Sequence, residues 1–242
     1  MRHRERMKTV LETASGVIGN SQVTLDELAL FARSEKLKMP PAIAAWLGTD
    51  PLPSAPAAPP LVRPTFVILG TIEARKNHLL LLNIWSRLVD RLGENAPKLV
   101  IIGGRGWEAD RVFNLLDHSE KLRGHVAELE NCSDEELAQH LAAARALLFP
   151  STTEGYGLPL VEALALGVPV IASDLPVFRE IGGDIPAYLS PDDETGWEAT
   201  ILDYAKQNSA SRAAQLERMR GFQAPNWKSH FDKVEHWLQT LG

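Results

Sequence analysis

From residue 65 onward, short apolar runs alternate with segments of helical pattern, and no other feature constrains the fold more strongly. TFVILG (65–70), KLVIIG (98–103) and ALLFPS (146–151) are apolar over most of their length and too short for helices. Strands that are buried on both faces have this composition, and they occur in parallel sheets that helices cover on both sides. The repeated strand-then-helix order therefore predicts a doubly wound α/β fold around one parallel sheet.

The other elements of this region follow from the same kind of pattern. Ser133 and Glu136 form an S-x-x-E capping box, which predicts that a helix starts at this point. Gly167 follows another helical pattern, and glycine commonly terminates helices. We expect further strands at 123–129, 168–173 and 187–190, and helices at 78–92, 107–116, 133–144, 158–166 and 227–241.

Composition and charge narrow the function classes. Apolar residues make up 45% and charged residues 23% of the 242 residues, which is typical of a globular protein in water. The net charge of −6 gives no argument for nucleic acid as a partner. No apolar run approaches the ~20 residues that span a bilayer. The single cysteine, Cys132, excludes a disulfide framework, so we expect a cytoplasmic protein and leave open a peripheral contact at the inner face of the membrane.

A proline-rich segment divides the chain. Residues 51–64 hold six prolines in fourteen positions. Because proline fixes φ and removes a backbone donor, this segment predicts a stiff linker. It separates residues 1–50 from the strand-and-helix region at 65–224, and a terminal helix within 225–242 closes the chain.

Cations and glycines follow two of the predicted strands, at the end where ligands bind in doubly wound folds. Arg75 and Lys76 come after the first strand, and two adjacent cations there suit a diphosphate, although a solvated surface pair has the same sequence. After the run at 146–151, Gly155 and Gly157 allow a tight turn into a helix. The free N–H groups at such a helix start attract anions.

Two carboxylates frame this helix start. Glu154 precedes the glycine turn, and Glu162 lies one turn into the helix, eight residues later. A carboxylate can accept hydrogen bonds from two vicinal hydroxyls, so the pair suits sugar or ribose hydroxyls. Taken alone, Glu162 is better explained as a first-turn acid that stabilises the helix, and Glu154 as part of a polar surface loop. The ordered combination of strand, acid, glycines and helix favours the binding interpretation.

The residues EGYGLPLVE (154–162) resemble the E-x7-E signature of the retaining nucleotide-sugar glycosyltransferases of family 4, which have the GT-B fold. Gly70 with the RKN run at 75–77 resembles the glycine and basic pair of that family's donor domain. The resemblance covers about 65–203. Within the family, GTIEARKNHLLLL (70–82) is most similar to mannosyltransferases of polysaccharide assembly.

The resemblance implies roles for the matching residues. Arg75 and Lys76 would bind the donor diphosphate and stabilise the leaving nucleotide, and Glu154 would contact the donor sugar. Glu162 would hold the ribose hydroxyls, and the backbone around Val126 would face the nucleobase. The implied binding residues are Gly70, Val126, Gly155, Tyr156, Gly157, Leu158 and Glu162, in addition to the catalytic Arg75, Lys76 and Glu154.

The resemblance also implies the substrates. The donor would be a nucleoside-diphosphate sugar, with GDP-mannose expected first and a UDP-sugar second. A hexose would pass with retention to a hydroxyl of an acceptor glycan or lipid-linked saccharide. The family needs no divalent metal, which agrees with the absence of a D-x-D triplet from this sequence.

Part of the family pattern is missing. Residues 14–30 and 43–50 resemble the end of an acceptor domain, so 1–50 is expected to be a remnant of that domain and 65–224 the donor domain. The isolated chain is then expected to bind donor but to transfer sugar poorly or not at all. The amphipathic helix at 227–241 resembles the terminal helix that crosses back to the first domain. Apolar surface left uncovered there predicts self-association, or a partner that carries the missing domain.

Three other interpretations stay open on the sequence. GRGWEA (104–109) matches the G-x-G-x-x-A dinucleotide fingerprint, and Glu128 follows about 20 residues later, as in an NAD-dependent oxidoreductase. A donor-binding remnant without catalytic activity is the second interpretation. Another GT-B enzyme, such as a sugar-nucleotide epimerase, is the third.

Overall fold

One six-stranded parallel sheet, with the strand order β5-β4-β3-β6-β7-β8, forms the centre of the molecule. The computed structural model describes residues 2–53 and 63–241, so most of the predicted linker at 51–64 lies outside the described residues. The predicted doubly wound α/β fold is confirmed. The strands are β3 (Thr65–Leu69), β4 (Lys98–Ile102), β5 (Val126–Leu129), β6 (Ala146–Phe149), β7 (Val170–Ser173) and β8 (Ala187–Leu189).

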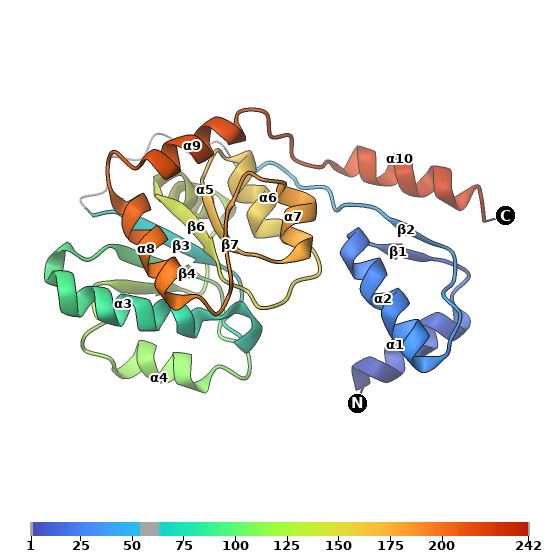
Figure 1. Ribbon diagram of the computed structural model, residues 1–242, viewed down its shortest axis with the longest axis horizontal. Helices are drawn as coiled ribbons and strands as arrows, with labels where there is room; N and C mark the ends of the chain where they lie inside the picture. Colours follow the sequence, from blue (N-terminus) through green and yellow to red (C-terminus); the bar gives the residue numbers. More distant parts are fainter. Residues whose placement is uncertain (1, 54–62, 242) are drawn as a thin grey trace.

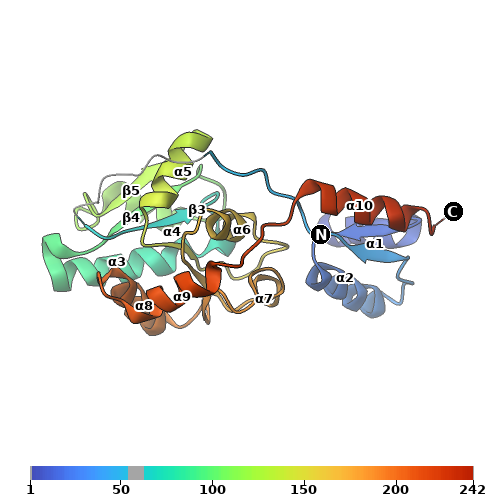
Figure 2. The ribbon, with the colours of Figure 1, turned by 90° about the horizontal axis from the view of Figure 1, so that it is seen from above.

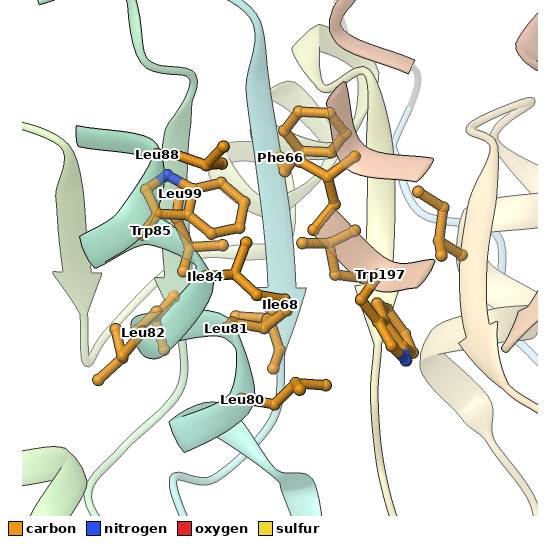
Figure 3. Close-up of a cluster of buried hydrophobic side chains, with 14 of the residues drawn as sticks. Phe66, Ile68, Leu80, Leu81, Leu82, Ile84, Trp85, Leu88, Leu99 and Trp197 are labelled. Carbon is orange, nitrogen blue, oxygen red and sulfur yellow. The ribbon is translucent and has the colours of Figure 1, made fainter. Parts of the chain in front are cut away.

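Helices cover both faces of this sheet (Figure 1). Successive side chains of β3 point to opposite faces, so that Phe66 and Ile68 enter one core and Val67 the other. Figure 3 shows the first core, where Trp85 packs against Phe66 of β3 and Trp197 comes from a second helix. The first face carries α3 (His78–Leu92), α4 (Asp110–His118) and α8 (Glu194–Ala205), and the second carries α5 (Asp134–Ala143), α6 (Leu158–Ala165), α7 (Pro176–Gly182) and part of α9 (Ala210–Met219).

Most predicted boundaries hold to within a few residues. The capping box is present: Glu136 N donates to Ser133 Oγ at 3.2 Å, and Ser133 N donates to Glu136 Oε2 at 2.9 Å. The helix expected from residue 107 starts only at Asp110, because Glu108 has a φ of 57°, which a right-handed helix does not allow. The sequence patterns missed α7 and an amino-terminal helix, α1 (Arg2–Thr13).

The first fifty residues form a small unit beside the sheet. It consists of α1, β1 (Val17–Gly19), α2 (Gln22–Glu35) and β2 (Ala42–Ala44), with β1 and β2 parallel. The terminal helix α10 (Trp227–Leu238) lies next to this unit, as Figures 1 and 2 show. A Cβ atom on Gly16 would lie only 2.6 Å from Trp237 Cη2, so the helix packs closely here. The proposed domain assignment and self-association stay predictions.

One carboxylate on α7 connects this unit to the sheet region. Glu180 accepts hydrogen bonds from the backbone N–H groups of Gln22 and Val23, at 2.8 and 3.0 Å, and from Trp46 Nε1 at 2.8 Å. The two N–H groups belong to the first turn of α2, where no helical carbonyl is available to them. Glu180 therefore positions α2 beside the loop that precedes α6.

Candidate functional site

The strand order places two loops on either side of a topological switch point. β3 and β6 are neighbours in the sheet, but the chain runs from β3 outward through β4 and β5 and from β6 outward through β7 and β8. The loops that follow β3 and β6 therefore diverge, and a crevice at this point is where ligands bind in doubly wound folds. Arg75 and Lys76 lie on the first loop and Glu154 on the second.

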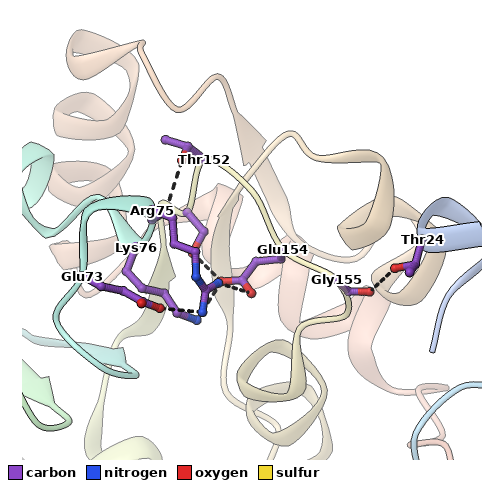
Figure 4. Close-up of polar contacts among 8 residues, drawn as sticks. Thr24, Glu73, Arg75, Lys76, Thr152, Glu154 and Gly155 are labelled. Carbon is purple, nitrogen blue, oxygen red and sulfur yellow. Dashed lines mark hydrogen bonds and ion pairs between the residues drawn. The ribbon is translucent and has the colours of Figure 1, made fainter. Parts of the chain in front are cut away.

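These three side chains meet in one ionic cluster (Figure 4). Arg75 NH1 lies 2.8 Å from Glu154 Oε2, and Lys76 Nζ lies 2.7 Å from Glu154 Oε1. Ser151 Oγ donates to the same Oε1 at 2.9 Å, and Glu73 Oε1 lies 2.6 Å from Arg75 NH2. The cations are thus brought together as expected, but both are already paired with carboxylates.

Lys76 is held in an unusual setting for a lysine. Its side chain is 10% exposed and lies over the ring of Phe149, with Nζ 5.1 Å from the ring centroid. Gly70 has a φ of 131°, and a Cβ atom there would lie 3.3 Å from Lys76 Cε. Glycine at position 70 therefore gives the backbone its shape and leaves room for the lysine side chain. A buried lysine stays charged only if carboxylates or a bound anion compensate it.

The start of α6 forms the opposite side of the crevice. Gly157 precedes the helix with a φ of 124°, Pro159 lies in its first turn, and Leu158 is 37% exposed. The backbone N–H groups at the start of a helix lack helical partners and attract anions. The carbonyl oxygen of Gly155 accepts hydrogen bonds at 3.0 Å from both Ser21 Oγ and Thr24 Oγ1.

The side chain of Tyr156 has a structural role, in addition to the residue's place in the lining of the crevice. Its side chain is 4% exposed, and its hydroxyl donates to the carbonyl oxygen of Leu47 at 3.0 Å. Burial raises the pKa of this hydroxyl to about 12, with a smaller effect from Glu180. The tyrosine side chain therefore ties the loop after β6 to the amino-terminal unit.

A cavity of about 770 Å³ lies over the cluster, which is within the range of small-molecule sites. Asn20, Thr24 and Glu27 of the amino-terminal unit also line it, and no sequence pattern distinguishes them. The same is true of Glu73, because a lone glutamate in a polar loop has no distinguishing pattern. From the predicted site, the lining includes Arg75, Lys76, Glu154, Gly155, Tyr156, Gly157 and Leu158.

Gly70, Glu162 and Val126 are predicted site residues that do not line this cavity. Glu162 is half-buried one turn into α6, and its pKa is raised first by burial and second by the charge of Asp134 at the start of α5. Val126 is the first residue of β5 and pairs with Leu99. Strands rise ~3.3 Å per residue, so Val126 lies ~10 Å from the carboxyl end of its strand. The expected nucleobase contact of the backbone around Val126 stays a prediction.

The dinucleotide fingerprint does not form a nucleotide site. Glu128 is bound by Arg105, with Nε to Oε1 at 2.8 Å and NH2 to Oε2 at 2.7 Å. Arg105 also holds Asp117 at 2.7 Å. Glu128, which the fingerprint predicts to bind a ribose, therefore holds Arg105 in the loop after β4 instead. In addition, α4 begins only after Ala109.

The described residues hold neither a metal-binding cluster nor a membrane-spanning helix. Among residues 2–53 and 63–241, no group of three or more His, Cys, Asp or Glu side chains is arranged to hold a metal ion. No helix in that same part of the chain combines the length and apolar character that crossing a bilayer requires.

Known proteins resemble this chain in sequence and in fold. The family described as glycosyl transferases group 1 matches residues 55–209. The serotype-specific mannosyltransferase WbdA of Escherichia coli is 35% identical over 181 residues, 74% of this chain and 21% of WbdA. The O-antigen chain mannosyltransferase B of Escherichia coli is 32% identical over 161 residues, 66% of this chain and 42% of that protein.

A solved structure extends the comparison to the whole chain. The crystal structure of an S. aureus TarM mutant in complex with fondaparinux, α-GlcNAc-glycerol and UDP matches with a TM-score of 0.74 and 16% identity. The match covers all of this chain and 47% of TarM. The chain thus spans between a fifth and a half of the length of these proteins.

Proposed function

The chain belongs to the glycosyl transferases group 1 family, and we propose that it is the donor-binding part of a mannosyltransferase. One observation carries this proposal: Arg75, Lys76, Glu154 and the start of α6 line one cavity at the switch point of the sheet, and both cations are bound to Glu154. Cations and free N–H groups suit the diphosphate of a nucleotide sugar, and a carboxylate suits its hydroxyls.

The proposed reaction transfers a hexose between two oxygen atoms. The bond between the anomeric carbon and the diphosphate oxygen breaks, and the acceptor hydroxyl forms a new bond to that carbon on the same face. The hydroxyl proton passes to the departing diphosphate. Arg75 and Lys76 stabilise the negative charge that develops on the diphosphate, and no metal ion is required.

The remaining contacts follow the same logic. Glu154 accepts hydrogen bonds from the sugar, and the backbone from Gly155 to Leu158 donates to the sugar and phosphate. Glu162 accepts the ribose hydroxyls from its position one turn into α6. GDP-mannose is the first candidate donor, because the relatives are named mannosyltransferases. A glycan or lipid-linked saccharide at the inner face of a membrane is the acceptor in this proposal.

Binding without transfer is the second candidate function. The chain spans 21% of WbdA and 47% of TarM, so a binding unit that needs a further acceptor domain accounts for the same cavity. Calorimetry with GDP, UDP and ADP sugars, followed by a transfer assay with the donor that binds, separates the two functions. Binding with turnover supports the enzyme, and binding without turnover supports the binding unit.

The double variant Arg75→Ala with Lys76→Ala tests the site itself. Charge-assisted hydrogen bonds contribute ~1.5–3 kcal/mol each, so the affinity for the donor should fall by about 100-fold or more. Lys206→Ala with Arg220→Ala removes the same two positive charges and serves as the control. Both of these side chains are mostly exposed, at 67% and 76%, and neither lines the cavity. If the site variant keeps the donor affinity of the control, the proposed function is wrong.

A further inference from the structure

With Glu73 included, the ionic cluster at the crevice has two cations and two carboxylates and so no formal net charge. Arg75 is bound by two carboxylates, Glu154 at 2.8 Å and Glu73 at 2.6 Å, whereas Lys76 is bound only by Glu154 among the described residues, at 2.7 Å. The side chains of Glu73, Lys76 and Glu154 are 8%, 10% and 9% exposed. Water and salt therefore screen these charges weakly.

A diphosphate cannot simply be added to this cluster. Its oxygen atoms would take the positions that the carboxylate oxygens occupy beside the cations, and like charges at such distances repel strongly where screening is weak. One carboxylate must therefore give up its ion pairs when the diphosphate binds.

The two carboxylates differ in their freedom to do so. Glu73 shares one short turn with Arg75, and its carbonyl oxygen accepts from Lys76 N at 3.0 Å. The preceding residue, Ile72, is bridged to Arg105 of the next loop. Glu154 comes from the other loop and lines the cavity with the start of α6, whereas Glu73 is not among the residues that line it. Glu154 can thus exchange its bonds with the two cations, and the one from Ser151 Oγ at 2.9 Å, for bonds to a sugar in the cavity, while Glu73 stays with Arg75.

We propose that Glu154 makes the site prefer the sugar-bearing donor to the bare nucleoside diphosphate. When the donor binds, the carboxylate leaves the two cations for vicinal hydroxyls of the hexose, and the diphosphate takes its place. A nucleoside diphosphate offers no hydroxyl at this position, so Glu154 stays beside the cations and competes with the ligand. Glu73 is a positioning residue that holds Arg75 in both states. This inference rests on the proposed function and identifies what the same site selects.

Two variants with the same charge change test it. Glu154→Gln and Glu73→Gln each remove one negative charge from the cluster and keep the side-chain shape. Calorimetry on the full chain with inorganic pyrophosphate, GDP and GDP-mannose gives three affinities for each variant. Glu154→Gln should bind pyrophosphate and GDP about fivefold or more tightly than the wild type, and lose about tenfold in the ratio of GDP-mannose to GDP affinity. Glu73→Gln should raise all three affinities and change that ratio by less than about threefold.

The results separate this inference from the proposed function. A wild-type chain that binds none of the three ligands refutes both. If the wild type binds but Glu154→Gln leaves GDP affinity unchanged or weaker, only the exchange is refuted. Equal changes of the ratio in the two variants also refute it, because lost charge alone would then explain both. Circular dichroism checks that each variant folds. If Glu154→Gln does not fold, Glu154→Ala replaces it, and its affinities should change in the same directions.

Discussion

Replacing Glu180 by alanine should release the first turn of α2 from the sheet region. The carboxylate accepts from Gln22 N, Val23 N and Trp46 Nε1 at 2.8, 3.0 and 2.8 Å. Hydrogen bonds to charged groups contribute ~1.5–3 kcal/mol each, but Glu180 is half-exposed and water can replace part of each bond. We therefore expect a loss of about 2–4 kcal/mol in the free energy that holds α2 in place.

Hydrogen exchange of individual amides measures this loss directly. At ~1.4 kcal/mol per tenfold change, the amides of Gln22 and Val23 should exchange about 30- to 700-fold faster in Glu180→Ala. Glu180→Gln keeps one acceptor oxygen, so its exchange rates should lie between those of the wild type and Glu180→Ala. Glu217→Gln, on a side chain that is 64% exposed, is the control. Exchange of both amides within threefold of the wild type in Glu180→Ala would refute the reasoning.

Three further changes test other parts of the structure. His78 is 2% exposed, and burial, with a smaller effect from the charge of Lys76, lowers its pKa to about 4. The unfolded chain therefore gains a proton on this histidine as the pH falls from 6.5 to 4, whereas the folded chain does not. Urea titrations over this range should show a loss of up to about 3 kcal/mol in the free energy of unfolding, and His78→Gln should lack this loss. Parallel pH profiles of the two proteins would contradict the prediction. Gly157→Ala should destabilise by ~1–3 kcal/mol, because φ is 124° and the new Cβ lies 2.9 Å from Phe178, and an unchanged urea midpoint would argue against that strain. Ser133→Ala removes a helix cap and should lower the free energy of unfolding by ~1 kcal/mol in the same assay. A urea midpoint equal to that of the wild type would contradict this.

The local pattern of the sequence determines much of this fold. Residues in the strands of a parallel sheet are buried on both faces, so β3, β4 and β6 are recognisable as apolar runs without any knowledge of their neighbours. The same holds for the capping box at Ser133 and for the glycine turn before α6, because caps and turns depend on residues only a few positions apart. The start of α4 was misplaced for a reason that is also local, the positive φ of Glu108.

Tertiary structure decided which of the candidate residues share a site. Arg75 and Glu154 are 79 positions apart, and they meet only because β6 pairs with β3 and not with β5, the strand before it in the chain. Strand order and register depend on contacts between distant segments, so periodicity does not reveal that Val126 begins its strand and pairs with Leu99. It does not reveal the partners of Glu73 and Glu180 either. The residue types around the crevice are a property of the sequence, whereas the neutral charge of the cluster follows from how the sheet brings the loops together.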